Sequence, residues 1–289
     1  MIDASSRVVR TLDCSPTDEL AHTMLSNGMS RRLGDESRPS HALLERHIRY
    51  LDTSLRARYQ DCKSPQARLE LCRAGLANGL AWTGWLRATE LFGIRWCDIV
   101  FTPAELMATH DLPAVVAMLQ LRLAPATKSC RTKVADVILA AITHSGFDVG
   151  FWYHSLRTEL RLTSADAAEC PALVFQHSNG TSWDSKFFRG TYLIPSLNDQ
   201  RLAGDPSLLP FDGSTPGNTL AEKFWSMHSY RRGARSHVSR KRATNGRKAS
   251  EDEVNEHGRW RVKRTSLSMS RSYLQWPISD RFQLTARCM

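Results

Sequence analysis

The spacing of apolar and polar positions divides the N-terminal half of the chain into helical stretches. Apolar residues recur at helical spacing after Ser40, which predicts a helix with Ser40 as its N-cap. The pattern breaks at "CKSP" (62–65), and a second helical pattern begins near Gln66. That pattern continues to about residue 100 in two segments, and Gly79 and Gly84 mark the predicted turn between them.

The middle of the chain changes from helical to strand-like spacing. "MLQLRL" (118–123) and "VADVIL" (134–139) have the composition of short strands, and the polar, basic loop between them is typical of a β-hairpin. Residues 143–160 return to a helical pattern. Residues 163–217 are rich in Asp, Ser, Pro and Gly, which predicts loops and short helices and no separate domain.

Helical patterns return in the last third of the chain. A helix is predicted over 219–241, where Thr219 and Glu222 have the spacing of a capping box. Another is predicted to begin after Ser250 as N-cap, and a last one to end before Pro277. Together these patterns predict a mainly α (α+β) fold, a helical domain with a small antiparallel sheet.

The net charge of the chain indicates which class of partner it binds. The 289 residues carry 39 Lys and Arg against 29 Asp and Glu, a formal net charge of +10. Such an excess favours a polyanion, above all nucleic acid, with an acidic membrane surface as the weaker alternative. No apolar run approaches the roughly 18 residues that a membrane span needs, so we expect no membrane partner.

Cysteine usage and the first residues indicate an intracellular protein. The seven cysteines are scattered and none forms a CxxC pair, which argues against a zinc knuckle and against a disulfide framework. The N-terminal stretch has no apolar core of a signal peptide. We therefore expect a reducing intracellular compartment, and the nucleus in a eukaryotic host.

The positive charge is concentrated between Ser229 and Ser250, where eight Lys or Arg occur without Asp or Glu. Such a run is typical of a surface that binds phosphate backbones, or of a bipartite nuclear-localisation signal. The residues that we expect to contact the DNA backbone are Arg232, Arg235, Arg240, Lys241 and Arg242.

Two residues at the head of this run point to chemistry as well as binding. His228 and Arg231 are three residues apart, so on a helix they share one face and could converge on one phosphate. The planar guanidinium of arginine can bind two phosphate oxygens at once. A histidine can donate a hydrogen bond or move a proton near neutral pH.

Further motifs extend this pair into an ordered set. "TGWLRATELFGIRWCDI" contains Arg87, the hairpin loop "TKS" contains Lys128, "EHGRW" contains His257, and "SRSYLQW" contains Tyr273. The order Arg, Lys, His-x-x-Arg, His, Tyr resembles the order of active-site residues in the tyrosine recombinase (phage-integrase-like) family. The motif "HSYRRGA…HGRW" is similar to the corresponding motifs of family members found in eukaryotic mobile elements.

The resemblance implies the domain organisation. Residues 63–276 would form the recombinase catalytic domain, and 277–289 a C-terminal tail. Residues 1–62 would be a short N-terminal region with a disordered start and part of a helical core-binding (SAM-like) segment. In the family this segment completes a clamp around DNA, so a shortened one predicts weaker encirclement.

The resemblance also implies an activity, site-specific DNA recombination and integration through a 3′-phosphotyrosyl intermediate. Tyr273 would attack a DNA phosphodiester, Lys128 would protonate the leaving oxygen, and the remaining residues would stabilise the phosphate. The implied partner is double-stranded DNA, bound by a homo-tetramer on paired sites, and neither a cofactor nor a metal is required. The implied catalytic set is Arg87, Lys128, His228, Arg231, His257 and Tyr273.

Several readings stay open from the sequence. Arg87 could be a structural partner of Glu90 or Asp98, two acidic residues that we expect to support the first motif, and Lys133 could replace Lys128. Trp82, Trp85 and Trp96 are expected in the core. Alternative functions are a DNA-binding protein that has lost strand transfer, a type IB topoisomerase, or a basic RNA-binding protein.

Overall fold

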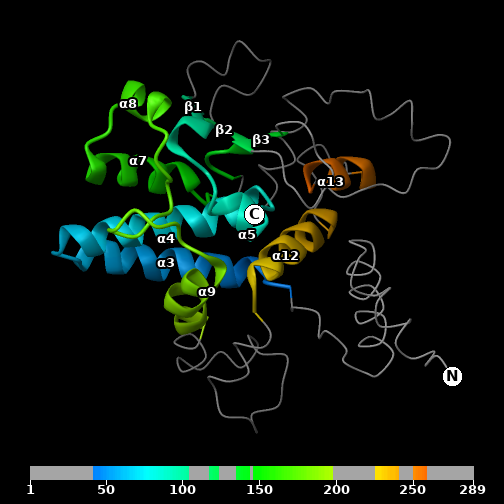
Figure 1. The fold of residues 1–289 in the computed structure, drawn as a ribbon. Coiled ribbons are helices and arrows are strands. Elements are labelled where there is room, and N and C mark those ends of the chain that lie inside the picture. The colour runs from blue at the N-terminus through cyan, green and yellow to red at the C-terminus, as the bar shows by residue number, and fades with distance from the viewer. Residues whose placement is uncertain are drawn as a thin grey trace, which may run out of the picture. The chain divides into compact units, whose positions relative to one another are not determined.

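Two antiparallel helices lie side by side at the centre of the fold (Figure 1). They are α3 (Glu45–Asp61) and α4 (Pro65–Thr83), joined by residues 62–64. The structure, a computed structural model, describes residues 42–103, 117–123, 135–143, 146–197, 225–240 and 250–258. Ser64 caps α4 through a bond from the backbone N–H of Ala67, with proline in the first turn. Every residue of α4 from 71 to 83 is buried, so neighbours pack around all of its sides.

Two details of the predicted N-terminal helices are wrong. Residues 42–44 are not helical and α3 begins at Glu45, where Nδ1 of His47 accepts a bond from the backbone N–H of Leu44. Gly79 lies inside α4 and not in a turn, whereas Gly84 does end the helix as its C-cap. A Cβ at Gly79 would come within 2.9 Å of Cγ1 of Val149, so the glycine permits the close approach of a neighbouring helix.

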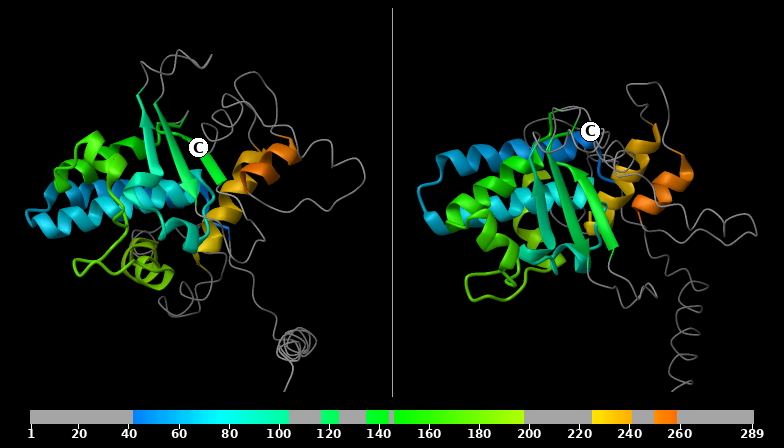
Figure 2. Two further views of the ribbon diagram at one scale, coloured as in Figure 1. Left: turned by 45° about the horizontal axis from the view of Figure 1, so that its top comes forward. Right: turned by 90° about the horizontal axis from the view of Figure 1, so that it is seen from above.

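The predicted hairpin is confirmed, and it belongs to a three-stranded antiparallel sheet (Figure 2). The strands are β1 (Ile99–Thr102), β2 (Met118–Leu123) and β3 (Ala135–Ala140), in the order β1-β2-β3. Alternate residues of the central strand β2 are buried, and Leu121 lies opposite Ile99 of β1 and Val137 of β3. The coarse prediction of a mainly helical α+β fold with a small antiparallel sheet is therefore confirmed.

The strand β1 was not predicted, because the helical pattern was extended to residue 100. In its place the chain forms the short helix α5 (Ala88–Leu91), the 3₁₀ turn η1 (Trp96–Asp98) and then β1. Each short helix is capped by an acidic side chain that accepts a backbone N–H three residues earlier, Glu90 from Arg87 and Asp98 from Arg95. The two caps begin two separate short helices within a stretch whose apolar spacing is that of one continuous helix.

Helix α7 (Val149–Leu160) packs along α4. It begins at Val149 and not at 143, because Asp148 caps it by accepting the backbone N–H of Phe151 at 2.8 Å. The following segment contains α8 (Ser164–Glu169), α9 (Ser185–Phe188) and the π-helical turn η4 (Arg189–Leu193). Loops with short helices, as predicted, describe this segment as far as residue 197.

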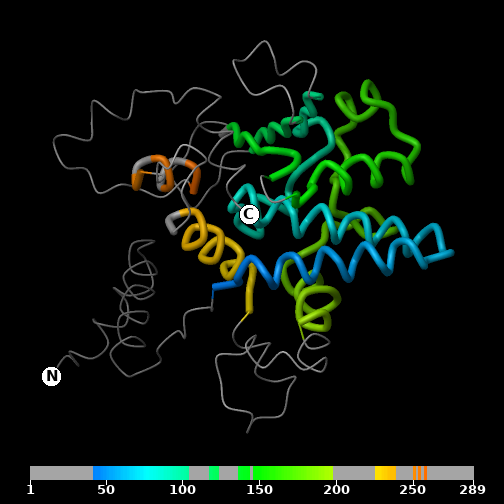
Figure 3. The backbone as a smooth tube through the Cα atoms, turned by 180° about the vertical axis from the view of Figure 1, so that it is seen from behind, coloured from blue at the N-terminus to red at the C-terminus, as the bar shows by residue number. Residues whose placement is uncertain are grey.

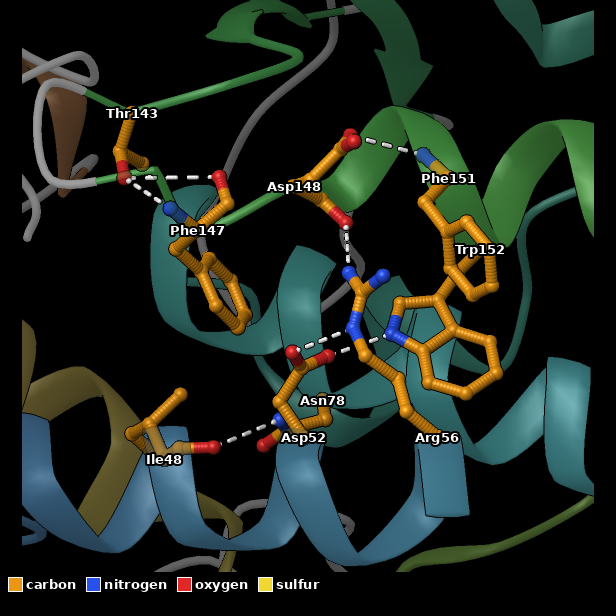
Figure 4. A network of polar contacts seen from close by, with 9 residues as sticks. All are labelled: Ile48, Asp52, Arg56, Asn78, Thr143, Phe147, Asp148, Phe151 and Trp152. Carbon is orange, nitrogen blue, oxygen red and sulfur yellow. Dashed lines mark hydrogen bonds and ion pairs between the residues drawn. The ribbon is translucent and has the colours of Figure 1, made fainter. Parts of the chain in front are cut away.

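A polar network fixes α3, α4 and α7 against one another (Figure 4). The buried carboxylate of Asp52 accepts bonds from Nε1 of Trp152 at 2.5 Å and from Nε of Arg56 at 2.8 Å. Arg56 also donates to the backbone carbonyl of Asp148, which caps α7. In the same view Asn78 of α4 donates to the carbonyl of Ile48 in α3. These bonds satisfy polar groups that burial would otherwise leave without partners.

Helix α12 (Met227–Arg240) crosses the N-terminal end of α3, as Figure 3 shows from behind. The buried hydroxyl of Tyr230 donates to Oδ1 of Asn78 at 3.0 Å, and the N–H of Leu43 donates to the carbonyl of Ser229. The helix begins at Met227, later than the predicted 219, since residues 225–226 are not helical. Thr219 and Glu222 lie outside the described residues.

Helix α13 (Glu251–His257) contacts α12 and begins as predicted, with Ser250 as its cap. Ser250 and Glu253 form a reciprocal capping box. The helix predicted before Pro277 lies outside the described residues. Among the segments that are described, no helix combines the length and the apolar composition of a membrane span.

Gly233 tests the close contact between α12 and the start of α3. A Cβ there would overlap the carbonyl oxygen of Leu43 and lie 2.8 Å from the Trp82 ring. We predict that Gly233→Ala lowers the free energy of unfolding by about 3 kcal/mol, because the overlapping atom is backbone. Gly190→Ala is the matched control, since a Cβ there meets no atom within 4 Å. Urea unfolding measures both; equal midpoints would contradict the packing described.

Candidate functional site

The carboxylate of Glu90 joins two of the arginines that the sequence singled out. Its Oε1 lies 2.7 Å from Nη1 of Arg87, and its Oε2 lies 3.9 Å from Nη1 of Arg231. Oε2 also accepts a hydrogen bond from the backbone N–H of Arg87, and this local bond fixes the orientation of the carboxylate. The side chain of Glu90 is 5% exposed, as is that of Arg231, whereas that of Arg87 is 32% exposed. One buried anion thus contacts two cations of different accessibility.

Arg231 connects three segments that are distant in sequence. Its guanidinium donates to the carbonyl of Trp85 at 2.8 Å and to the carbonyl of Gly258, which follows α13. Trp85 is fully buried and has a φ of 48°, in the left-handed region that few residues with side chains adopt. The carbonyl bonded by Arg231 therefore belongs to a strained residue just beyond the end of α4.

His257 is held at the same end of α4. Its Nε2 lies 2.9 Å from the carbonyl oxygen of Thr83, and its ring meets the ring of Trp85 edge-on with centroids 4.6 Å apart. Because a carbonyl can only accept, Nε2 carries a proton and Nδ1 is the nitrogen that can take up another. Thus His257 and Arg231 are both anchored on carbonyls at the C-terminal end of α4.

His228 faces a pocket of about 280 Å³. Residues from the start of α5, from α9 and η4, and from the start of α12 form its walls, and Arg87 and Arg189 are among them. No Asp or Glu of the described residues lines it. Partial burial, followed by the positive charges of Arg231, Arg87 and Arg232, lowers the pKa of His228 below its ordinary value. His228 is therefore mainly neutral at pH 7, in a cavity suited to an anion.

Four of the six predicted catalytic residues are thus brought together around the end of α4 and the start of α12: Arg87, His228, Arg231 and His257. Lys128 and Tyr273 lie outside the described residues, as does Lys133. The sequence also allowed Arg87 to be a structural partner of Glu90, and the structure does show an ion pair between these two residues.

The predicted backbone-binding residues are only partly described. Arg232 of α12 is exposed, and Arg235 lies 3.6 Å from Glu251 in an exposed ion pair. Lys241 and Arg242, and the side chain of Arg240, lie outside the description. Asp98 caps η1 locally, and the three tryptophans expected in the core, Trp82, Trp85 and Trp96, are buried.

Two residues that line the pocket, Ser185 and Arg189, were not predicted from the sequence. Both residues come from a segment predicted to form loops and short helices, about a hundred residues beyond Arg87. A local signal was present, since Asp184 caps α9 by accepting the backbone N–H of Phe187 at 2.7 Å. Nothing in that signal predicts that the helix faces α12.

No protein-family model matches the chain, and no curated protein shows significant similarity to it. Within the described ranges no group of three or more His, Cys, Asp or Glu side chains could hold a metal ion.

Glu90→Gln tests the anion at the centre of the cluster. We predict a loss of about 3 kcal/mol in the free energy of unfolding, because two guanidinium groups lose the buried charge that contacts both. Glu251→Gln, which removes the anion of an exposed pair with Arg235, should cost less than about 0.5 kcal/mol. Urea unfolding measures both variants.

A double-mutant cycle then measures the interaction between the Glu90 carboxylate and Arg231 separately from the effects of each single change. If the prediction is correct, the double variant Glu90→Gln/Arg231→Met loses clearly less free energy of unfolding than the sum of the losses in the two single variants. Strict additivity would show that the Glu90 carboxylate and Arg231 do not interact.

Proposed function

We propose that this protein is a DNA strand transferase of the tyrosine recombinase type, which breaks and rejoins double-stranded DNA through a 3′-phosphotyrosyl intermediate. The observation that supports this most is the convergence of Arg87, His228, Arg231 and His257, which come from three segments of the chain. Their order in the sequence resembles the order of active-site residues in this family, and their chemistry suits a phosphodiester.

The two arginines would supply positive charge to the reacting phosphate. Arg87 is the more exposed and lines the pocket, so it is suited to direct contact with phosphate oxygens. Arg231 is buried and does not line the pocket, so it would add positive charge near the phosphate without contacting it through the pocket. Because the carboxylate of Glu90 offsets one of the two positive charges, the trio keeps a net charge of +1 for the charge that develops in the transition state.

The two histidines would differ in role. His228 is mainly neutral, so it can accept a proton or donate one hydrogen bond at the pocket. The ring of His257 is oriented by the Thr83 carbonyl and the Trp85 ring, which leaves Nδ1 as its basic nitrogen. Either imidazole could take the phenolic proton of the nucleophile.

The remaining steps fall on residues outside the described ranges and follow from the resemblance. The phenolic oxygen of Tyr273 would attack the phosphorus and give its proton to a histidine, and the bond from phosphorus to the 5′ oxygen would break. Lys128 would protonate that oxygen, leaving a free 5′-hydroxyl. Attack by a 5′-hydroxyl on the phosphotyrosine would reverse the step and rejoin a strand, without external energy.

A second candidate is a DNA-binding protein that retains the fold without strand transfer. The burial of Arg231 favours it, because this guanidinium donates to the backbone carbonyls of Trp85 and Gly258. An arginine used in this way stabilises the fold whether or not a phosphate is present. The two candidates predict different results with a cleavable substrate.

Covalent capture of DNA distinguishes them. Incubation with a pool of nicked suicide duplexes should give a protein–DNA adduct that resists SDS, because the cleaved end diffuses away before rejoining. Tyr273→Phe should abolish the adduct, whereas Tyr50→Phe, a matched change on α3, should not. Arg87→Gln should reduce its rate about 10²–10³-fold.

The other outcomes identify the alternatives. Duplex binding without an adduct would favour the DNA-binding protein and overturn the strand-transfer proposal. Relaxation of plasmids without site preference would indicate a type IB topoisomerase.

The pH dependence of DNA binding tests the placement of His228. A phosphate in the pocket would raise the lowered pKa of His228, so binding should take up a proton and the affinity should rise as the pH falls from about 7.5 to 5.5. The charged groups that face His228 are Arg87, Arg231 and Arg232, and all three are unchanged in the variant that tests it.

Fluorescence anisotropy at constant ionic strength measures the dependence. His228→Gln should bind with a weaker dependence on pH, while His257, present in both proteins, contributes equally. Identical profiles for the two proteins would show that no phosphate approaches His228.

A further inference from the structure

The pocket beside His228 contains a cation that the proposed catalytic set does not use. Arg189 lines it from the π-helical turn η4, together with Ser185 of α9. Arg87 and His228 line it from α5 and α12. Two arginines and a histidine from three separate elements therefore surround one cavity of about 280 Å³, just below the usual size range of ligand pockets.

Arg189 differs from the other arginines of this region in its contacts. Arg87 and Arg231 share the carboxylate of Glu90, and Arg235 lies beside Glu251. No hydrogen bond or ion pair joins the side chain of Arg189 to another of the described residues. It is half-buried, so part of its hydration is already lost. Its charge is thus available to an anion in the pocket.

The backbone around Arg189 is also unusual. Residues Arg189–Leu193 form a π-helical turn, a rare conformation that is frequent at functional sites. Phe188 and Tyr192 on either side of Arg189 are buried in the core. These two buried aromatic residues anchor the turn that carries Arg189 in the core.

We propose that Arg189 is a phosphate-binding residue, and that the pocket holds a phosphate group of the bound DNA strand between Arg189 on one wall and Arg87 with His228 on the other. The hydroxyl groups of Ser185 and Ser226, which also line the cavity, can donate to the same oxygens. This inference rests on DNA as the substrate of the proposed function. It adds a positioning contact outside the six residues that the sequence predicted.

The salt dependence of DNA binding tests the proposal. Each phosphate contact that is lost reduces the slope of log K against log salt concentration by about 0.9. Arg189→Gln should reduce the slope by about that amount, and Arg189→Lys should restore most of it. Lys186→Gln, on the preceding helix α9 and outside the pocket lining, removes an equal charge and should leave the slope unchanged. Circular dichroism and thermal unfolding verify that each variant is folded.

A second measurement is independent of DNA and of strand transfer. Inorganic phosphate should raise the unfolding temperature of the wild-type protein and of Lys186→Gln, and this rise should be smaller in Arg189→Gln. If it is, while no covalent adduct forms, the anion pocket stands and the proposed strand transfer fails. If Arg189→Gln matches the wild type in both salt slope and phosphate response, the role of Arg189 is overturned, even where an adduct depends on Tyr273.

Discussion

The candidate site depends on the buried carboxylate of Glu90. Arg87 and Arg231 carry like charges, and at an effective dielectric constant of about 20 two unit charges 4 Å apart interact by about 4 kcal/mol. Glu90 contacts both guanidinium groups, at 2.7 and 3.9 Å, so they can approach a common region without strong repulsion. The acid that caps the start of α5 is therefore also the one that makes a doubly cationic site stable in a buried setting.

The C-terminal end of α4 provides the second constraint. The last carbonyls of a helix have no partner within it and attract positive groups. Here the carbonyl of Thr83 is bonded by His257, and that of Trp85, just beyond the cap, by Arg231. α12 is set over this end by the bond between Tyr230 and Asn78 and by the contact of Gly233 with Leu43. Backbone carbonyls at the end of the central buried helix and just beyond it therefore position His257 and Arg231.

The sequence predicted the parts of this structure that local chemistry determines. The hairpin strands, the Ser250 cap and the burial of Trp82, Trp85 and Trp96 follow from alternation, capping and size. It failed where tertiary contacts decide: Gly79 had the pattern of a turn, but it accommodates Val149. For the site, an ordered set of residue types was enough to select Arg87, His228, Arg231 and His257. Arg189 could not be found in this way, because only the packing of η4 brings it to the pocket.

The bonds of Arg231 also have a consequence for synthesis of the chain. Its two carbonyl partners lie 146 residues before it, at Trp85, and 27 after it, at Gly258. At about 5–20 residues per second, on the order of ten seconds separate the appearance of Glu90 from that of Gly258 at the ribosome. A nascent chain thus carries Arg87 and Glu90 long before Arg231 is anchored, and the bonds around Arg231 cannot all form until Gly258 has been synthesised.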